Sequence, residues 1–316
     1  MGVIASAQAA VDCLAVGPED EVLVLCNDPQ LLIADALGEA AGEHARSVRV
    51  LAFPAGERHG EEPPADVISA MAEATVIFAP TTFSLSHTAA RVEATRRGTR
   101  MATMPGITDD VFRRALDVDY GELKRAGEAL AAQLTAASFC RVRSRGGTDL
   151  TLDLVDREGI SDDGDLRARG AFGNLPAGEA FIAPIETSGE GVIVYDGALG
   201  GYGLLETPVE VTVSRGRVLS AVGGAAGPWL EATLDAGGEF GRSIAELGIG
   251  TNPAARLTGN VLEDEKALGT IHLAFGTSLG IGGVNRSSVH IDGLVLRPTV
   301  ELDGRVLMED GTLVPQ

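Results

Sequence analysis

The sequence has few aromatic residues and few basic residues. Aromatic side chains make up only 4% of the 316 residues, so no stacking motif can be read from the sequence. Lysine and arginine together number 25 against 45 aspartates and glutamates, which gives a net charge of −20. Because nucleic acids and anionic membranes attract basic proteins, this balance argues against both as partners and is typical of a solvated acidic surface.

The sequence also lacks paired cysteines, long apolar runs and a basic N-terminal segment. Its three cysteines lie far apart and form no CxxC pair, which predicts reduced thiols at Cys13, Cys26 and Cys140. No apolar run is long enough to cross a membrane, and residues 1–9 lack the basic residues of a secretory signal. We therefore expect a cytoplasmic protein that does not bind membranes.

Strand-like and helix-like segments alternate in the first part of the chain. Short apolar runs predict four buried parallel strands at residues 21–26, 47–53, 75–80 and 99–104. Helical patterns follow at residues 65–74, 87–97 and 109–134. Repeated βα units of this kind predict a Rossmann-like α/β domain over residues 1–135. There is neither a GxGxxG motif after the first strand nor a P-loop, so nucleotide binding is unsupported.

Glycines and hairpin signals dominate the second part of the chain. The 41 glycines indicate many tight turns and a large β component. A hairpin turn is predicted at residues 214–216, and another at residues 303–305 between strands at 295–302 and 306–308. Short helices are predicted at 228–236 and 262–268. We therefore expect a β-rich α+β domain over residues 136–316, built on a mixed or barrel-like sheet.

Two histidines near the C-terminus lie in strand-like segments. In His290-Ile291-Asp292 the imidazole and the carboxylate would point to the same side of a strand, because alternate side chains share a face. His272 lies in another apolar run 18 residues earlier. Two imidazoles and a carboxylate on rigid strands suit zinc, manganese, cobalt or iron. A histidine that is satisfied within the core is the alternative interpretation.

Two glutamates are isolated among apolar and glycine residues. Burying the carboxylate of Glu179 or Glu246 without a partner would be costly. One solution is a structural ion pair with an arginine. The other is a shared metal site with the histidines and Asp292, because a set of five ligands could hold two divalent ions about 3.5–4 Å apart.

These residues occur in segments that resemble the aminopeptidase S and T family of metallopeptidases. The similar segments span most of the chain and are residues 104–108, 147–150, 174–184, 246–248, 263–276 and 290–293. The resemblance implies five metal ligands, namely Glu179, Glu246, His272, His290 and Asp292. It also implies two ions of zinc, cobalt or manganese, a homodimer, and a peptide or related small-molecule substrate. The expected reaction is hydrolysis of an N-terminal peptide bond or related amide by a metal-activated water.

Two features depart from that family. Its tyrosine, seven residues after the histidine that matches His272, is replaced here by Leu279, which removes a candidate donor to the tetrahedral intermediate. The chain also has only 17 residues between His272 and His290. A shorter loop could open the pocket to a different substrate.

A more distant resemblance is to 2,5-dihydroxypyridine 5,6-dioxygenase, which cleaves a ring with one Fe(II) ion. The shared ligand pair would be His290 and Asp292. The dioxygenases carry a histidine where this chain has Glu246, and they lack matches to Glu179 and His272. A hydrolase is therefore expected, with the Fe(II) dioxygenase as the alternative.

Three residues are candidate catalytic groups. His87 matches the acid–base histidine of the dioxygenases and lies at the carboxyl edge of the predicted parallel sheet; a surface or capping histidine is the other interpretation. In the hydrolase, Glu263 or Glu265 would carry a proton to the leaving amine, although acidic residues at a helix start are also typical of a solvated surface. A metal-stabilised scaffold without activity is a third hypothesis, but five ligands exceed the four of a closed structural site.

Overall fold

The structure is a computed structural model of the chain and describes residues 2–315. The chain packs into two compact units. The first comprises residues 2–122 and 162–177, and the second comprises residues 123–161 and 178–315. The predicted domain boundary after residue 135 differs from this division in two segments. Residues 123–135 belong to the second unit, and residues 162–177 return to the first.

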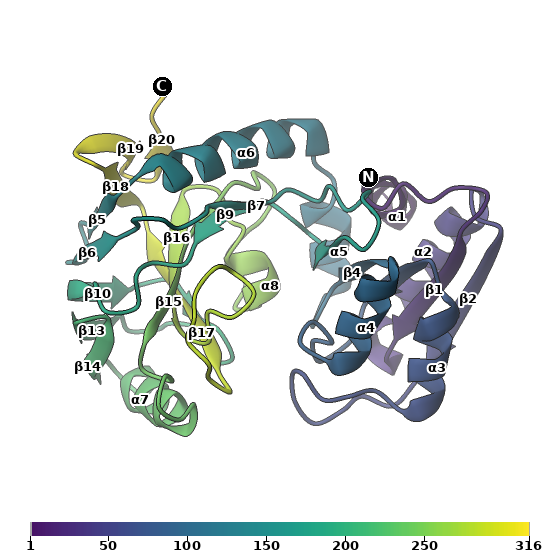
Figure 1. Cartoon of the computed structure of the whole chain (residues 1–316), viewed down its shortest axis with the longest axis horizontal. Helices are drawn as coiled ribbons and strands as arrows, with labels where there is room; N and C mark the ends of the chain where they lie inside the picture. Colours follow the sequence, from purple (N-terminus) through teal and green to yellow (C-terminus); the bar gives the residue numbers. More distant parts are fainter. Residues whose placement is uncertain (1, 316) are drawn as a thin grey trace. The chain divides into compact units, whose positions relative to one another are not determined.

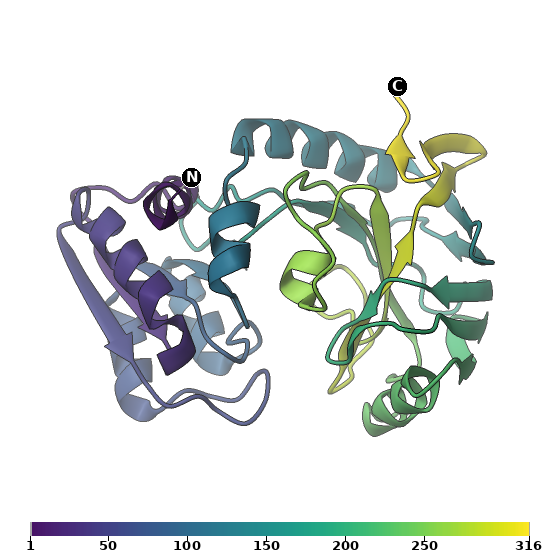
Figure 2. The same cartoon turned by 180° about the vertical axis from the view of Figure 1, so that it is seen from behind.

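The first unit is built on a parallel sheet of five strands, with helices on both faces (Figures 1 and 2). The strand order is β2 (Ser47–Ala52), β1 (Glu21–Cys26), β3 (Val76–Ala79), β4 (Arg100–Thr103) and β8 (Phe172–Asn174). The helices are α1 (Val3–Cys13), the 3-10 turn η1 (Asp28–Gln30), α2 (Leu31–Gly42), α3 (Ala65–Glu73), α4 (Ala89–Arg97) and α5 (Asp109–Ala115).

Alternation along the central strands explains how this sheet is covered. Leu23 and Leu25 on β1 and Ile77 on β3 point to one face, where they pack against Val67 and Met71 of α3. The next residues along each strand are equally buried and point to the opposite face. Strands that are buried on both faces have continuous apolar sequences. The apolar runs therefore predict the positions of these strands closely.

Four predicted boundaries are wrong. The helix expected over residues 262–268 is the single turn α8 (Val261–Asp264), which ends at Asp264. The single helix expected over residues 109–134 is two helices, α5 and α6 (Tyr120–Ala136), because the Asp119 carboxylate accepts the Glu122 N–H and begins a new helix. The helix expected from His87 begins at Ala89, after Thr88 accepts the Arg91 N–H. The strand expected over residues 295–302 is divided at Arg297, whose φ is 45°.

The second unit contains two large sheets. The first has eight strands in the order β14 (Arg217–Val222), β13 (Val209–Ser214), β10 (Glu190–Tyr195), β6 (Asp149–Asp153), β5 (Phe139–Ser144), β18 (Pro298–Leu302), β19 (Arg305–Glu309) and β20 (Thr312–Leu313). The second has seven in the order β12 (Gly203–Leu204), β11 (Ala198–Leu199), β17 (His290–Leu296), β16 (Thr270–Gly276), β15 (Ile244–Gly250), β9 (Glu179–Ile182) and β7 (Ile160–Asp162).

Both sheets contribute to one apolar core. Val142 and Ile193 of the eight-stranded sheet belong to the same buried cluster as Leu247, Ile271 and Phe275 of the seven-stranded sheet. Helix α7 (Ala226–Ala236) packs on β13 and β14 (Figure 2), and the short helix α8 (Val261–Asp264) precedes β16. The apolar core covers one face of the seven-stranded sheet. Polar side chains can therefore gather on its other face.

The expected mixed α/β architecture is confirmed, with one parallel sheet and large antiparallel sheets. Among residues 2–315, none of the helices has the length and apolar character required to cross a membrane.

Candidate metal centre

The five predicted ligands lie on four neighbouring strands of the seven-stranded sheet, in the order β17, β16, β15 and β9. Residues directly opposite each other on neighbouring antiparallel strands point to the same face. Ala274 of β16 lies opposite both Glu246 and Asp292, and Gly250 of β15 lies opposite Glu179. The pairing register therefore places the ligands on one face, across several strands.

Strand β15 shows how the sequence makes room for this cluster. Its odd-numbered residues Leu247 and Ile249 are fully buried in the apolar core. Its even-numbered positions on the other face are Glu246, Gly248 and Gly250. A Cβ at Gly248 would lie 2.0 Å from the imidazole of His272, so only glycine leaves space for that ring. The alternation of one glutamate with two glycines thus forms a cradle for the neighbouring side chains.

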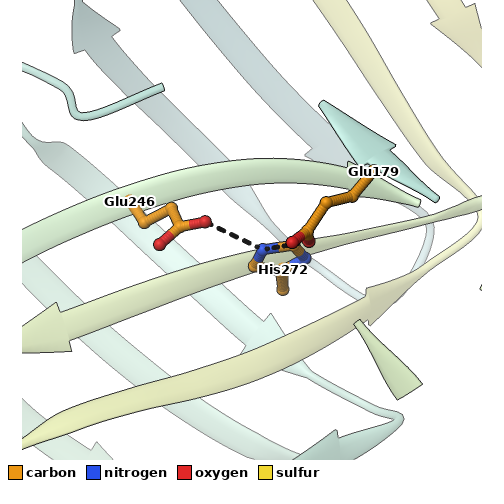
Figure 3. A group of neighbouring side chains, drawn as sticks. All are labelled: Glu179, Glu246 and His272. Carbon is orange, nitrogen blue, oxygen red and sulfur yellow. Dashed lines mark hydrogen bonds and ion pairs between the residues drawn. The ribbon is translucent and has the colours of Figure 1, made fainter. Parts of the chain in front are cut away.

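Glu246 is shared between the two histidines. Its Oε1 lies 3.3 Å from Nε2 of His272, and its Oε2 lies 3.2 Å from Nε2 of His290. The Oε2 of Glu179 lies 3.3 Å from the same nitrogen of His272, so two carboxylates flank that ring (Figure 3). The Oδ1 of Asp292 lies 3.3 Å from Nε2 of His290. The result is two groups of three candidate ligands with one carboxylate in common.

The tautomer of His290 makes this arrangement suitable for a cation. Its Nδ1 lies 2.8 Å from the carbonyl oxygen of Thr277, which requires Nδ1–H to donate. In the neutral ring Nε2 then carries a lone pair that faces the carboxylate oxygens of Glu246 and Asp292. These groups repel one another unless a proton or a metal ion lies between them. The donor set therefore fits a divalent metal that accepts nitrogen and oxygen ligands.

The pKa values of the histidines and of Glu246 also show that the cluster stabilises positive charge. Burial by itself would lower the pKa of His272, but the hydrogen bond with Glu246 and the charges of Glu179 and Asp292 outweigh it and raise the pKa to about 9. The pKa of His290 is likewise raised well above its usual value, against the effect of burial, by Asp292 and Glu246. Burial would raise the pKa of Glu246, yet the two histidines hold it well below its usual range.

A lysine that the sequence interpretation did not single out also belongs to this cluster. Lys266 is fully buried, and its Nζ lies 2.5 Å from Oε1 of Glu179 and 2.7 Å from Oε1 of Glu265. Glu265 is therefore close to the candidate ligands. Its local sequence, a run of charged residues at a helix start, is more typical of a solvated surface and gave little sign of this.

Two other predicted catalytic residues, Glu263 and His87, do not belong to the two groups of candidate ligands. Glu263 is buried rather than solvated, and its carboxylate accepts the Arg256 N–H at 2.7 Å and the Thr258 hydroxyl at 3.2 Å. Its oxygens therefore hold the loop before α8. His87 belongs to the first unit and lies on an exposed turn before α4. Leu279 is 42% exposed, in the loop between β16 and β17.

A carboxylate shared by two histidine-containing groups, on one face of a sheet, is typical of a metal-binding enzyme. The chain belongs to the 2,5-dihydroxypyridine 5,6-dioxygenase family, whose model matches residues 11–315. No curated protein matches the sequence.

Two solved structures are similar over nearly the whole chain. The 2,5-dihydroxypyridine dioxygenase from Pseudomonas putida is 20% identical, with a TM-score of 0.84 over 99% of this chain and 97% of that one. Wild-type AmpT from Thermus thermophilus is also 20% identical, with a TM-score of 0.75 over 99% of each chain. At this identity the likenesses show a shared fold, and the reaction has to be argued from the site.

Proposed function

We propose that this protein is a metal-dependent hydrolase that cleaves an N-terminal peptide bond or a related amide. The observation that carries the proposal is the position of Glu246, whose two oxygens each face a different histidine nitrogen. A bridging carboxylate of this kind suits two divalent ions held about 3.5–4 Å apart. The resemblance to aminopeptidases S and T, together with the similarity to AmpT, supports the same reaction.

The candidate ligands form two groups, one for each proposed ion. One ion would be held by Glu179, Glu246 and His272, and the other by Glu246, His290 and Asp292. Zinc, cobalt or manganese at these positions would supply Lewis acidity toward a carbonyl oxygen and toward water.

The residues around the ligands would supply orientation and proton transfer. The Thr277 carbonyl fixes the ring of His290. Glu265, linked to Glu179 through the Lys266 ammonium, is the candidate that carries a proton to the leaving amine. We assign no such role to Glu263, because its oxygens hold a loop.

The first experiment measures the metal content of protein purified without added metal or chelator, followed by hydrolysis of aminoacyl amides. The hydrolase should contain close to two zinc, cobalt or manganese ions per chain. Glu246→Gln should remove metal from both positions and abolish hydrolysis. Glu309→Gln is the matched control, because Glu309 is exposed on β19. Full activity in the Glu246 variant would exclude this centre.

The second candidate function is a mononuclear Fe(II) dioxygenase that cleaves a dihydroxylated ring. The family match and the similarity to the Pseudomonas putida enzyme favour it. In that case His290 and Asp292 would hold one iron, and His87 would act as acid–base. Close to one iron per chain, oxygen uptake with a dihydroxylated ring, and ring cleavage that survives Glu179→Gln would establish this function in place of the hydrolase.

A further inference from the structure

Lys266 is an unusual residue for this chain. Lysine and arginine together number 25, and only Lys124 and Lys266 are lysines. Lys124 lies on α6 with 41% of its side chain exposed and pairs with Glu128, whereas Lys266 is fully buried. A buried ammonium requires carboxylate partners. The chain therefore uses this compact cation at a place where the acidic residues are concentrated.

The ion pairs of Lys266 lie on the His272 side of the cluster. Its Nζ is 2.5 Å from Oε1 of Glu179, while the other oxygen of Glu179 is 3.3 Å from Nε2 of His272. Glu179 is therefore shared between an ammonium and the position at which a metal would meet His272. Glu265 is the second partner of the ammonium, at 2.7 Å.

The backbone holds Lys266 in place. Its N–H donates to the Glu263 carbonyl at 3.0 Å, and its own carbonyl accepts the Asn252 N–H at 2.9 Å. The chain at this point lies directly on β15, because a Cβ at Gly250 would be 2.2 Å from the Ala267 carbonyl oxygen. The ammonium is itself fully buried and paired with Glu179 and Glu265, so it is a fixed part of the cluster.

We infer that Lys266 is a resident cation that competes with a metal ion for Glu179 and makes the two metal positions unequal. The inference rests on the proposed two-ion centre. A carboxylate already paired with an ammonium offers less negative charge to a divalent ion, and the ammonium repels that ion directly. The position formed by Glu246, His290 and Asp292 therefore fills first, and the position formed by Glu179, Glu246 and His272 fills second and more weakly.

The test is a titration of the metal-free full-length protein with Mn²⁺ alone, with bound ions counted by equilibrium dialysis. Wild-type protein should bind two ions in separate steps. Lys266→Met should tighten the second step by about tenfold or more and leave the first within about threefold. Lys124→Met is the matched control and should reproduce the wild-type titration.

A second variant separates the charge of Lys266 from its hydrogen bonds. Lys266→Gln keeps N–H donors near Glu179 and Glu265 but removes the charge, so it should also tighten the second step. The inference is overturned if wild-type protein binds two ions equally, if the variants leave the second step unchanged or weaken it, or if neither protein takes a second ion. Amide hydrolysis is not part of this readout. The inference about Lys266 can therefore fail while the proposed reaction stands, and the proposed reaction can fail while the inference stands.

Discussion

In the proposed two-ion centre each histidine would hold one ion, whereas Glu246 would contact both. His272→Ala should therefore reduce the metal content from about two ions per chain to about one. Hydrolysis should fall by at least about 10–100-fold, the range found for partners one step further from a metal. His87→Ala should leave the metal content unchanged, because His87 is not among the candidate ligands. Metal analysis of both variants checks this, and loss of both ions from His272→Ala would contradict separate positions.

Single residues of the site differ in how well the sequence reveals them. The alternation in His290-Ile291-Asp292 placed an imidazole and a carboxylate on one face, and the structure brings Nε2 and Oδ1 to 3.3 Å. Lys266 could not be recognised in this way, because a lysine beside Glu263 and Glu265 looks like a solvated helix start. Its burial depends on Gly250, which is distant in sequence and makes room for its backbone.

At the scale of single elements, β15 is the strand on which the site depends. Gly248→Ala would put a methyl group 2.0 Å from the imidazole of His272, and overpacking of this kind costs about 1–3 kcal/mol. The ring would have to move, so we also expect loss of the ion held by His272. Thermal unfolding and metal content measure the two effects.

Gly42→Ala is the control for that substitution. Gly42 ends α2, and a Cβ there would meet nothing within 4 Å. Its free energy of unfolding should change by no more than about 1 kcal/mol, and in the stabilising direction. A Gly248 variant that behaves like the Gly42 variant would show that the cradle on β15 is not needed.

Whole elements were predictable where their pattern is local. The strand at residues 21–26 was located from its apolar run alone, and β1 has the same bounds. Strand β8 could not be located, because its three residues join the parallel sheet only after a long excursion of the chain through the second unit. The division of the helix expected over residues 109–134 depends on one capping carboxylate, at Asp119.

For the molecule as a whole, the fold and the site point to different relatives. The fold is closer to the dioxygenase, with a TM-score of 0.84 against 0.75 for AmpT. The resemblance to the aminopeptidases implies a ligand set that includes Glu179, Glu246 and His272, and these three side chains lie together in the cluster. A fold can host several reactions, so the metal count and the reaction assay decide between them.

The stability of the metal-free protein should depend on pH, and this dependence should be weaker when metal is bound. In the metal-free protein the pKa of His272 is raised from 6.5 to about 9 by Glu246, Glu179 and Asp292 against the effect of burial, and burial raises the pKa of Glu265 from 4.5 to about 8. Both groups hold protons more tightly when folded. Their stabilisation is complete below the lower value of each pair and is lost as the pH rises through the higher one.

The Tm of metal-free protein should accordingly fall between about pH 4.5 and pH 9. The Tm of metal-loaded protein, in which an ion replaces the proton on His272, should fall less over the same range. Metal binding near neutral pH should also release protons. Scanning calorimetry of both forms measures the first effect, and titration calorimetry in two buffers of different ionisation enthalpy measures the second. A metal-free Tm that is constant or rises across this range, with no proton release, would mean that the cluster is not held together by protons when metal is absent.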